Sequence, residues 1–161
     1  MKSNKIRKFF IFVCMVVFLF SAFKVVKIIE NGKREENNFE KLRIHIKSEK
    51  EKADNKRDSE EKLNTLFNQN HDFIAWLFIA DTPIDYPVMS TPNDPIYYLR
   101  RDFHKEYAIS GTFFIGDGLT PDSKSFVVYG HNMQNSTMFG TLDNYEDKKY
   151  MESHKYIELK T

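Results

Sequence analysis

The 161-residue sequence predicts a mostly β domain with helices on its amino-terminal side, placed behind a single transmembrane helix. Three observations support this prediction. A basic amino terminus precedes an uncharged apolar run, a polar region of mixed charge follows, and from Phe78 onward short apolar segments alternate with turn residues. Short strands separated by turns at this spacing are typical of a barrel or a sandwich. The sequence therefore divides into an anchor, a stalk and a folded part.

The anchor begins with a basic tail, residues 1–8, and continues as an uncharged apolar run over residues 9–23. This run is short for a membrane span, which needs roughly 20 residues. Apolar residues continue to Ile29, however, and the lysines among them can extend their ammonium groups toward the headgroups. We therefore expect a signal-anchor helix over residues 9–29. The positive-inside rule predicts a cytoplasmic tail and an extracellular remainder, in a single-pass protein of the cell membrane.

A cleaved signal peptide is the alternative for the same segment. It would share the basic tail and the apolar core, but a cleavage site of small residues should follow. Ser21-Ala22-Phe23 matches such a site poorly, and a lysine comes directly after it, so the sequence favours a retained anchor. Cys14 lies within the run, where a thiol acts as a small hydrophobe. The external part then has no cysteine, and disulfides cannot stabilise it.

The region after the anchor is polar. Residues 30–57 mix both signs of charge with few large apolar residues, which predicts a solvated helical or partly disordered stalk. Leu42, Ile44 and Ile46 are spaced by two, as in a strand, but these three residues are too few to define a sheet. The formal net charge of the chain is +1, which argues against a nucleic-acid partner, because such proteins normally carry a basic patch or stripe.

The folded part is expected to start with a helix. Asp58 followed by Glu61 resembles a capping box, and three apolar residues then share one face at helical spacing, namely Leu63, Leu66 and Phe67. A second apolar element at residues 71–77 can pack Trp76 into a core. Strands are expected over residues 78–80, 84–89, 112–115, 125–129 and 156–160. Pro87 suits an edge or bulged strand, and the spacing of apolar residues predicts a helix over residues 138–150.

The sequence has five histidines, namely His45, His71, His104, His131 and His154. None forms a tight metal-ligand pair with another, so neither a metal site nor a cofactor is expected. His131 differs from the rest because it follows an apolar segment, residues 126–129, that predicts a buried strand ending at Gly130. An imidazole is suited to proton transfer because its ordinary pKa is about 6.5. The residues alone leave a structural and a catalytic role open and favour the structural one, since no nucleophile motif such as G-x-S-x-G occurs.

Several short motifs follow one another along the chain: Trp76-Leu77, Ile84-Asp85-Tyr86-Pro87-Val88, Tyr97-Tyr98-Leu99, Gly111-Thr112-Phe113-Phe114, Tyr129-Gly130-His131-Asn132-Met133 and Met138-Phe139. In order and spacing this series resembles sortases, and most of all their class B branch. Sortases are membrane-anchored cysteine transpeptidases of Gram-positive bacteria. The resemblance covers residues 58–161, which would form a partial sortase-like catalytic domain, and the expected anchor agrees with it.

The resemblance implies an eight-stranded barrel with amino-terminal helices, of which about five strands are present. It implies that His131 is the catalytic histidine, and that Tyr129 and Leu99 lie near the substrate groove. In the family a cysteine thiolate cleaves the sorting signal at the carboxy terminus of a surface protein. The histidine protonates the leaving amine, an arginine stabilises the oxyanion, and an amine of the peptidoglycan precursor resolves the acyl-enzyme.

The sequence departs from the family at the nucleophile. The family's cysteine lies in a Thr-Leu-x-Thr-Cys strand well after the histidine, with the arginine beyond it, and the sequence ends at Thr161 before either one. We therefore expect a carboxy-terminally truncated class B-like sortase that is inactive alone and has open sheet edges. Two alternatives remain: a non-catalytic, membrane-tethered protein that binds peptides or regulates, and a chain completed by a separately encoded cysteine-bearing half.

Overall fold

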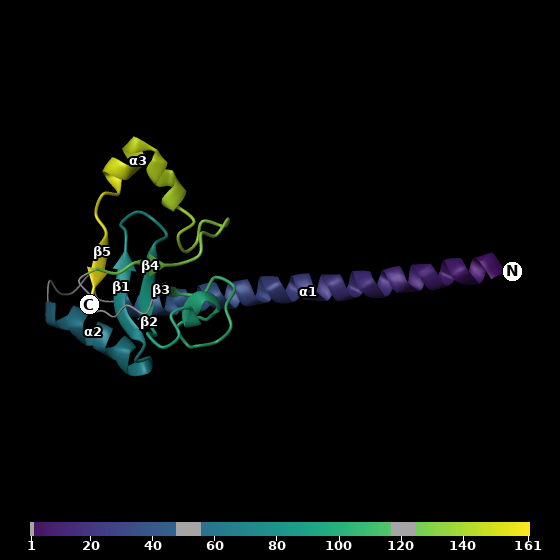
Figure 1. Cartoon of the computed structure of the whole chain (residues 1–161), viewed down its shortest axis with the longest axis horizontal. Coiled ribbons are helices and arrows are strands. Elements are labelled where there is room, and N and C mark those ends of the chain that lie inside the picture. Colours follow the sequence, from purple (N-terminus) through teal and green to yellow (C-terminus); the bar gives the residue numbers. More distant parts are fainter. Residues whose placement is uncertain (1, 48–55, 117–124) are drawn as a thin grey trace. The chain divides into compact units, whose positions relative to one another are not determined.

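The computed structural model describes residues 2–47, 56–116 and 125–161. The chain separates into two compact units, Met1–Arg34 and Glu35–Thr161. The first helix, α1 (Lys2–Lys47), begins in the first unit and ends in the second. All strands belong to the second unit, which is called the folded unit below (Figure 1).

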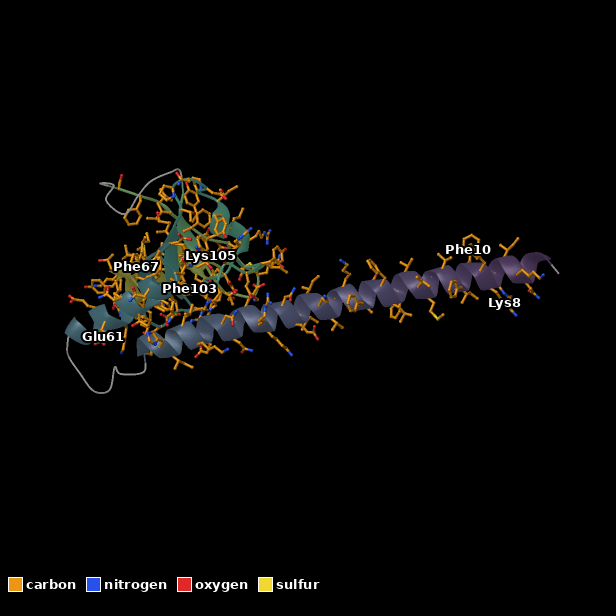
Figure 2. All side chains as sticks on the ribbon, turned by 90° about the horizontal axis from the view of Figure 1, so that it is seen from below. Lys8, Phe10, Glu61, Phe67, Phe103 and Lys105 are labelled. Atoms are coloured by element: carbon orange, nitrogen blue, oxygen red, sulfur yellow. The ribbon has the colours of Figure 1, made fainter. Side chains whose placement is uncertain are left out.

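The first unit is helical, and the large apolar side chains of residues 9–20 are exposed all round the helix. Figure 2 shows the side chains of Lys8 and Phe10 projecting from this part of α1, and 63% of the Phe10 surface is exposed. One stretch of α1 is long and apolar enough to cross a membrane, with a mean hydropathy of 2.6, and an amino-terminal signal sequence meets the same criteria. A helix that is apolar all round needs an apolar environment. The expected span over residues 9–29 lies within this stretch.

The folded unit is built on a mixed sheet of five strands: β1 (Phe73–Phe78), β2 (Asp85–Ser90), β3 (Phe113–Ile115), β4 (Val128–Tyr129) and β5 (Glu158–Lys160). Their order is β4-β3-β2-β1-β5. The β2–β3 pair is parallel and the other pairs are antiparallel. In the described residues the sheet is open, with β4 and β5 at its edges. The predicted class, mostly β with amino-terminal helices and about five strands, is confirmed.

The core of the unit lies where β1, β2 and β3 meet their neighbouring helices. Trp76 is almost fully buried, as the sequence predicts, and its Nε1 donates a hydrogen bond of 2.7 Å to Asp85 Oδ1. The same carboxylate forms an ion pair with Lys47 through Oδ2, at 2.6 Å. Phe103 also belongs to the core, in contact with Phe73 of β1, and Figure 2 labels its side chain inside the folded unit.

The helices differ in extent from their predicted ranges. Helix α2 (Lys56–Gln69) begins before Asp58, so Asp58 is a helical residue and not the cap. The single helix expected over residues 138–150 is wrong. Two short helices replace it, η2 (Leu142–Glu146) and α3 (Lys148–Ser153), because Asp147 between them is extended and caps α3 by accepting a hydrogen bond of 2.9 Å from Tyr150 N. In Figure 1, α2 and α3 lie at opposite ends of the sheet.

Three strand predictions also need correction. Strand β2 lies inside the sheet and not at an edge, and Pro87 is tolerated because β3 pairs with β2 only from Val88 onward. The expected strand over residues 78–80 is absent, because β1 ends at Phe78 and Asp81 takes a positive φ of 59° in the turn. The strand before His131 is not buried: 54% of Val127 is exposed, and β4 has only two residues.

The polar region 30–57 is not wholly a solvated stalk. From Glu35 onward α1 belongs to the folded unit, and Phe39 and Leu42 are core residues that are only 2% and 5% exposed. Arg43 lies over the Tyr86 ring, 4.5 Å from its centroid, and its Nε donates to Asp85 O at 3.0 Å. The compact unit therefore begins well before residue 58, where the sequence places the start of the domain. Residues 48–55 lie outside the described residues.

Candidate active site

The backbone at His131 is fixed by close packing just after β4. A Cβ on Gly130 would lie 2.4 Å from the Phe113 ring and 3.1 Å from the Phe139 ring, so no larger residue fits there without movement. Those two rings are stacked, with centroids 4.0 Å apart. Phe139 N donates a hydrogen bond of 2.9 Å to His131 O, which closes the turn over residues 131–139. Gly130 is thus required for space, and it carries no positive φ.

The imidazole of His131 is oriented by a backbone carbonyl. Its Nε2 lies 3.0 Å from Leu99 O. A carbonyl oxygen can only accept, so this hydrogen bond requires a proton on Nε2. The neutral ring then carries its acceptor lone pair on Nδ1. The contact fixes both the direction and the tautomer of a half-buried histidine.

Leu99 is itself held in a short 3₁₀ helix, η1 (Tyr97–Arg100). The backbone of Gly111 crosses directly beside it: a Cβ on Gly111 would lie 2.5 Å from Leu99 O, and the residue has a positive φ of 61°. Both features demand glycine at this position. Thr112 N donates to Tyr98 O at 3.0 Å and continues the same contact. The carbonyl that binds His131 therefore sits in a closely packed segment.

An apolar hollow of about 490 Å³ lies at Leu99, the residue whose carbonyl oxygen binds His131. Its lining residues are Pro95, Ile96, Leu99, Phe114, Gly116 and Tyr129. The Tyr129 ring stacks on Phe114, with centroids 5.7 Å apart, and lies over Gly116, where a Cβ would be 2.5 Å from the ring. Hollows of this size and character are typical of sites that bind small ligands or peptide side chains.

The structure brings together the three residues that the sequence singles out. Leu99 and Tyr129 line the same hollow, and His131 is bonded to Leu99. Sequence reasoning missed Phe114 and Gly116 as lining residues, although both stand in or beside predicted elements. Both residues line the hollow next to the ring of Tyr129, and the position of that ring cannot be predicted from the spacing of residues in the sequence. Among the described residues, no three His, Cys, Asp or Glu side chains are grouped in a way that could hold a metal ion.

Comparison with known proteins finds sortases that are similar to the chain. No family model matches the sequence. Sortase B of Listeria monocytogenes is 30% identical to the chain over 144 residues, which are 88% of this chain and 58% of that protein. Sortase B of Staphylococcus aureus is 29% identical over 150 residues, 90% of this chain and 59% of that one. Over most of its length the chain is similar to class B sortases. It spans just under three fifths of the length of these curated relatives.

Solved structures of sortase B share the fold. The Staphylococcus aureus sortase B–substrate complex matches with a TM-score of 0.68 and 26% identity, over 80% of this sortase-like chain and 59% of the other. A mutant form of Clostridium perfringens sortase B matches with a TM-score of 0.67 and 30% identity, over 78% and 58% of the two chains. These matches confirm the predicted class B resemblance.

Proposed function

We propose that this class B-like sortase chain supplies the histidine and the peptide-binding hollow of a transpeptidase site. The observation that carries the proposal is the hydrogen bond from His131 Nε2 to Leu99 O, because it places a proton-transfer group beside an apolar hollow lined by Leu99 and Tyr129. In this proposal the hollow receives an apolar part of a sorting signal. His131 acts on the scissile bond next to it.

The proposed chemistry is acyl transfer in two steps. A cysteine thiolate attacks the carbonyl carbon of the scissile peptide bond, and a thioester forms as the carbon–nitrogen bond breaks. The imidazolium of His131 gives its proton to the departing amine. An amine of the peptidoglycan precursor then attacks the thioester, so that a surface protein becomes joined to the cell wall and the thiol is restored. The Staphylococcus aureus sortase B solved with a substrate supports this choice of reaction class.

The thiol in this scheme has to come from outside the folded residues of this chain. The sequence has one cysteine, Cys14, and it lies in the apolar run. We propose that the 161 residues bind a sorting-signal peptide without cleaving it. We also propose that α1 anchors the protein with the amino terminus in the cytoplasm and the folded unit outside the cell.

A chimera tests the role of His131 directly. Residues 35–161 would replace the matching segment of Listeria monocytogenes sortase B, which would supply the rest of its own chain. We expect cleavage of a fluorogenic sorting-signal peptide, and a loss of about 10²–10⁴-fold in kcat on His131→Gln, the usual range for a general acid. His154→Gln is the matched control, because His154 lies at the end of α3 and bonds to Tyr150 O. An active chimera that is indifferent to His131→Gln would exclude the proposed role.

A second candidate function is a membrane-tethered protein that binds peptides without chemistry. The hollow favours it, because the binding surface is present in a folded unit that contains no cysteine. Peptide binding by the chain in detergent, weakened by Leu99→Ala and Tyr129→Ala, is expected under both functions. The two differ in the chimera: a binding protein would show no cleavage there that depends on His131.

A further inference from the structure

Glu35 is a buried carboxylate in α1 that accepts hydrogen bonds from one distant loop. It is only 5% exposed. Its Oε1 accepts from Ile109 N at 2.8 Å, and its Oε2 accepts from Ser110 N at 3.2 Å and Ser110 Oγ at 2.8 Å. A buried carboxylate is strongly unfavourable unless donors surround it. These three donors belong to two consecutive residues, so the carboxylate fixes that piece of backbone.

The loop that Glu35 binds, residues 97–112, returns on itself. Ala108 N donates to Arg100 O at 3.1 Å, and Arg100 Nη1 donates to Ile109 O at 2.6 Å. Gly111 follows Ser110 directly and crosses beside Leu99 O in a contact that only glycine permits. The returning arm of the loop is therefore packed against the arm that carries Leu99. Glu35 forms its hydrogen bonds with this returning arm.

A second contact from the same helix reaches the tip of this loop. Asn38 lies one turn after Glu35, and its Nδ2 donates to Asp102 Oδ2 at 3.1 Å. Asp102 is buried, and its Oδ1 accepts from His104 N and Glu106 N at 2.9 and 3.0 Å. Helix α1 thus contacts the loop at Asn38 as well as at Glu35, and the contact at Glu35 lies next to the backbone of Gly111.

We infer that Glu35 is a positioning residue for His131. The carboxylate fixes Ile109 and Ser110, the adjoining Gly111 packs against Leu99 O, and Leu99 O holds Nε2 of the imidazole. This series of contacts from Glu35 to His131, called the positional chain below, is a property of the fold. Its value for catalysis rests on the proposed function, in which a misdirected imidazole would protonate the leaving amine less well.

Histidine NMR on the full chain in detergent micelles tests the positional chain. The Nε2 proton of His131 would be assigned by its absence in His131→Gln. In Glu35→Gln the amide can offer one acceptor oxygen and turns an NH₂ group toward backbone donors, so the loop opens more often. We expect that proton to exchange with water about tenfold faster or more, which is within the usual range of coupling between two sites. Glu36→Gln is the control, because the adjacent carboxylate is half exposed and bonds to Arg43.

Unchanged exchange and unchanged ring shifts in a folded Glu35→Gln protein would overturn the inference. Trp76 emission reports whether the variant is folded, since this single tryptophan is buried. If Glu35→Gln does not fold, Ser110→Ala decides instead. It removes the Oγ donor and keeps both backbone donors, so a smaller shift in the same direction is required.

The chimera separates this inference from the proposed function. There, Glu35→Gln should lower kcat and leave KM nearly unchanged, because the hollow keeps its lining. If His131→Gln has no effect on cleavage while Glu35→Gln still alters the His131 resonance, the proposed function fails and the positional chain stands. If His131→Gln abolishes cleavage and Glu35→Gln changes neither resonance nor kcat, only the positional chain fails.

Discussion

Three glycines allow the segments of the site to approach each other more closely than side chains would permit. Gly111 lies beside Leu99 O, Gly116 lies under the Tyr129 ring, and Gly130 lies against the Phe113 ring. In each case an added Cβ would come within about 2.5 Å of another atom. At Gly111 and Gly130 that atom belongs to the backbone or to a buried ring, which cannot move aside easily. At Gly116 the obstacle is the more exposed ring of Tyr129.

Gly130→Ala is therefore expected to destabilise the folded unit by about 1–3 kcal/mol, the usual range for overpacking a filled space. The measurement is a urea unfolding curve followed by Trp76 fluorescence. Gly32→Ala is the control, since a Cβ there would meet nothing within 4 Å and alanine is favoured over glycine in a helix. An unchanged unfolding midpoint for Gly130→Ala would contradict the packing described here.

Tyr98 links stability to alkaline pH. Burial raises the pKa of its hydroxyl above the ordinary 10.0, and the hydroxyl donates to Asp72 Oδ2 and accepts from Asn70 Nδ2, both at 2.8 Å. The folded state therefore binds this proton more tightly than the unfolded state does. The resulting stability is fully present below pH 10 and is lost as the pH rises above it.

We expect the free energy of unfolding to fall as the pH rises above about 10, the ordinary pKa of tyrosine, and to fall less in Tyr98→Phe. At pH 7 that variant should be less stable by about 1 kcal/mol, the usual net value of a lost hydrogen bond. Burial also raises the pKa of Tyr86, so part of the alkaline loss should persist in the variant. Identical slopes for the two proteins would show that Tyr98 does not titrate in this way.

At the scale of elements, α1 shows where periodicity in the sequence was misread. Leu42, Ile44 and Ile46 are spaced by two, but the pattern that matters is Phe39, Leu42 and Ile46, which share a helical face. Phe39 and Leu42 enter the core, whereas Ile44 is 55% exposed. The charged residues between them make this apolar face difficult to recognise in the sequence. The burial of Glu35 could not be predicted at all, because its partners are backbone groups of a loop far along the chain.

Alanine substitutions on the two faces of this helix distinguish a packed helix from a solvated stalk. Phe39→Ala and Leu42→Ala should each lower stability by about 2–5 kcal/mol, since both remove buried side chains from a filled core. Ile44→Ala should change it by about 0.5 kcal/mol or less, as is usual for an exposed position. Equal effects at all three positions, measured by urea unfolding, would show that this part of α1 is a solvated stalk and not a packed helix.

The strands and the site differed in how far the sequence could predict them. Strands with alternating apolar residues and flanking turns, such as β2 and β3, were predicted within a residue or two. The helix after Met138 was not, because apolar spacing cannot reveal that Asp147 is extended. The order of motifs predicts His131, Leu99 and Tyr129 as site residues, and their roles stay a prediction. The hollow lined by Leu99 and Tyr129 could not be predicted, because its shape depends on the stacking of the Tyr129 ring on Phe114.

For the whole molecule, the start of the folded unit at Glu35 predicts where the chain can be shortened. A protein that begins at residue 30 keeps Glu35, Phe39 and Leu42, and we expect it to unfold cooperatively in urea. A protein that begins at residue 58 loses all three, and leaves Ser110 N and the core without their partners. We expect it to unfold non-cooperatively or to aggregate. Cooperative unfolding of the shorter protein, followed by Trp76 fluorescence, would place the domain boundary at residue 58 after all.

The distance along the chain between Glu35 and its partners also bears on how the protein is made. Ser110 lies 75 residues after Glu35, so at about 5–20 residues per second a ribosome takes about 4–15 seconds to add it. During that interval the carboxylate and the apolar face of α1 have emerged without the loop that will cover them. A nascent chain paused before Ser110 therefore exposes groups of α1 that are buried in the folded unit, and exposed apolar surface of this kind makes incompletely folded chains prone to aggregation.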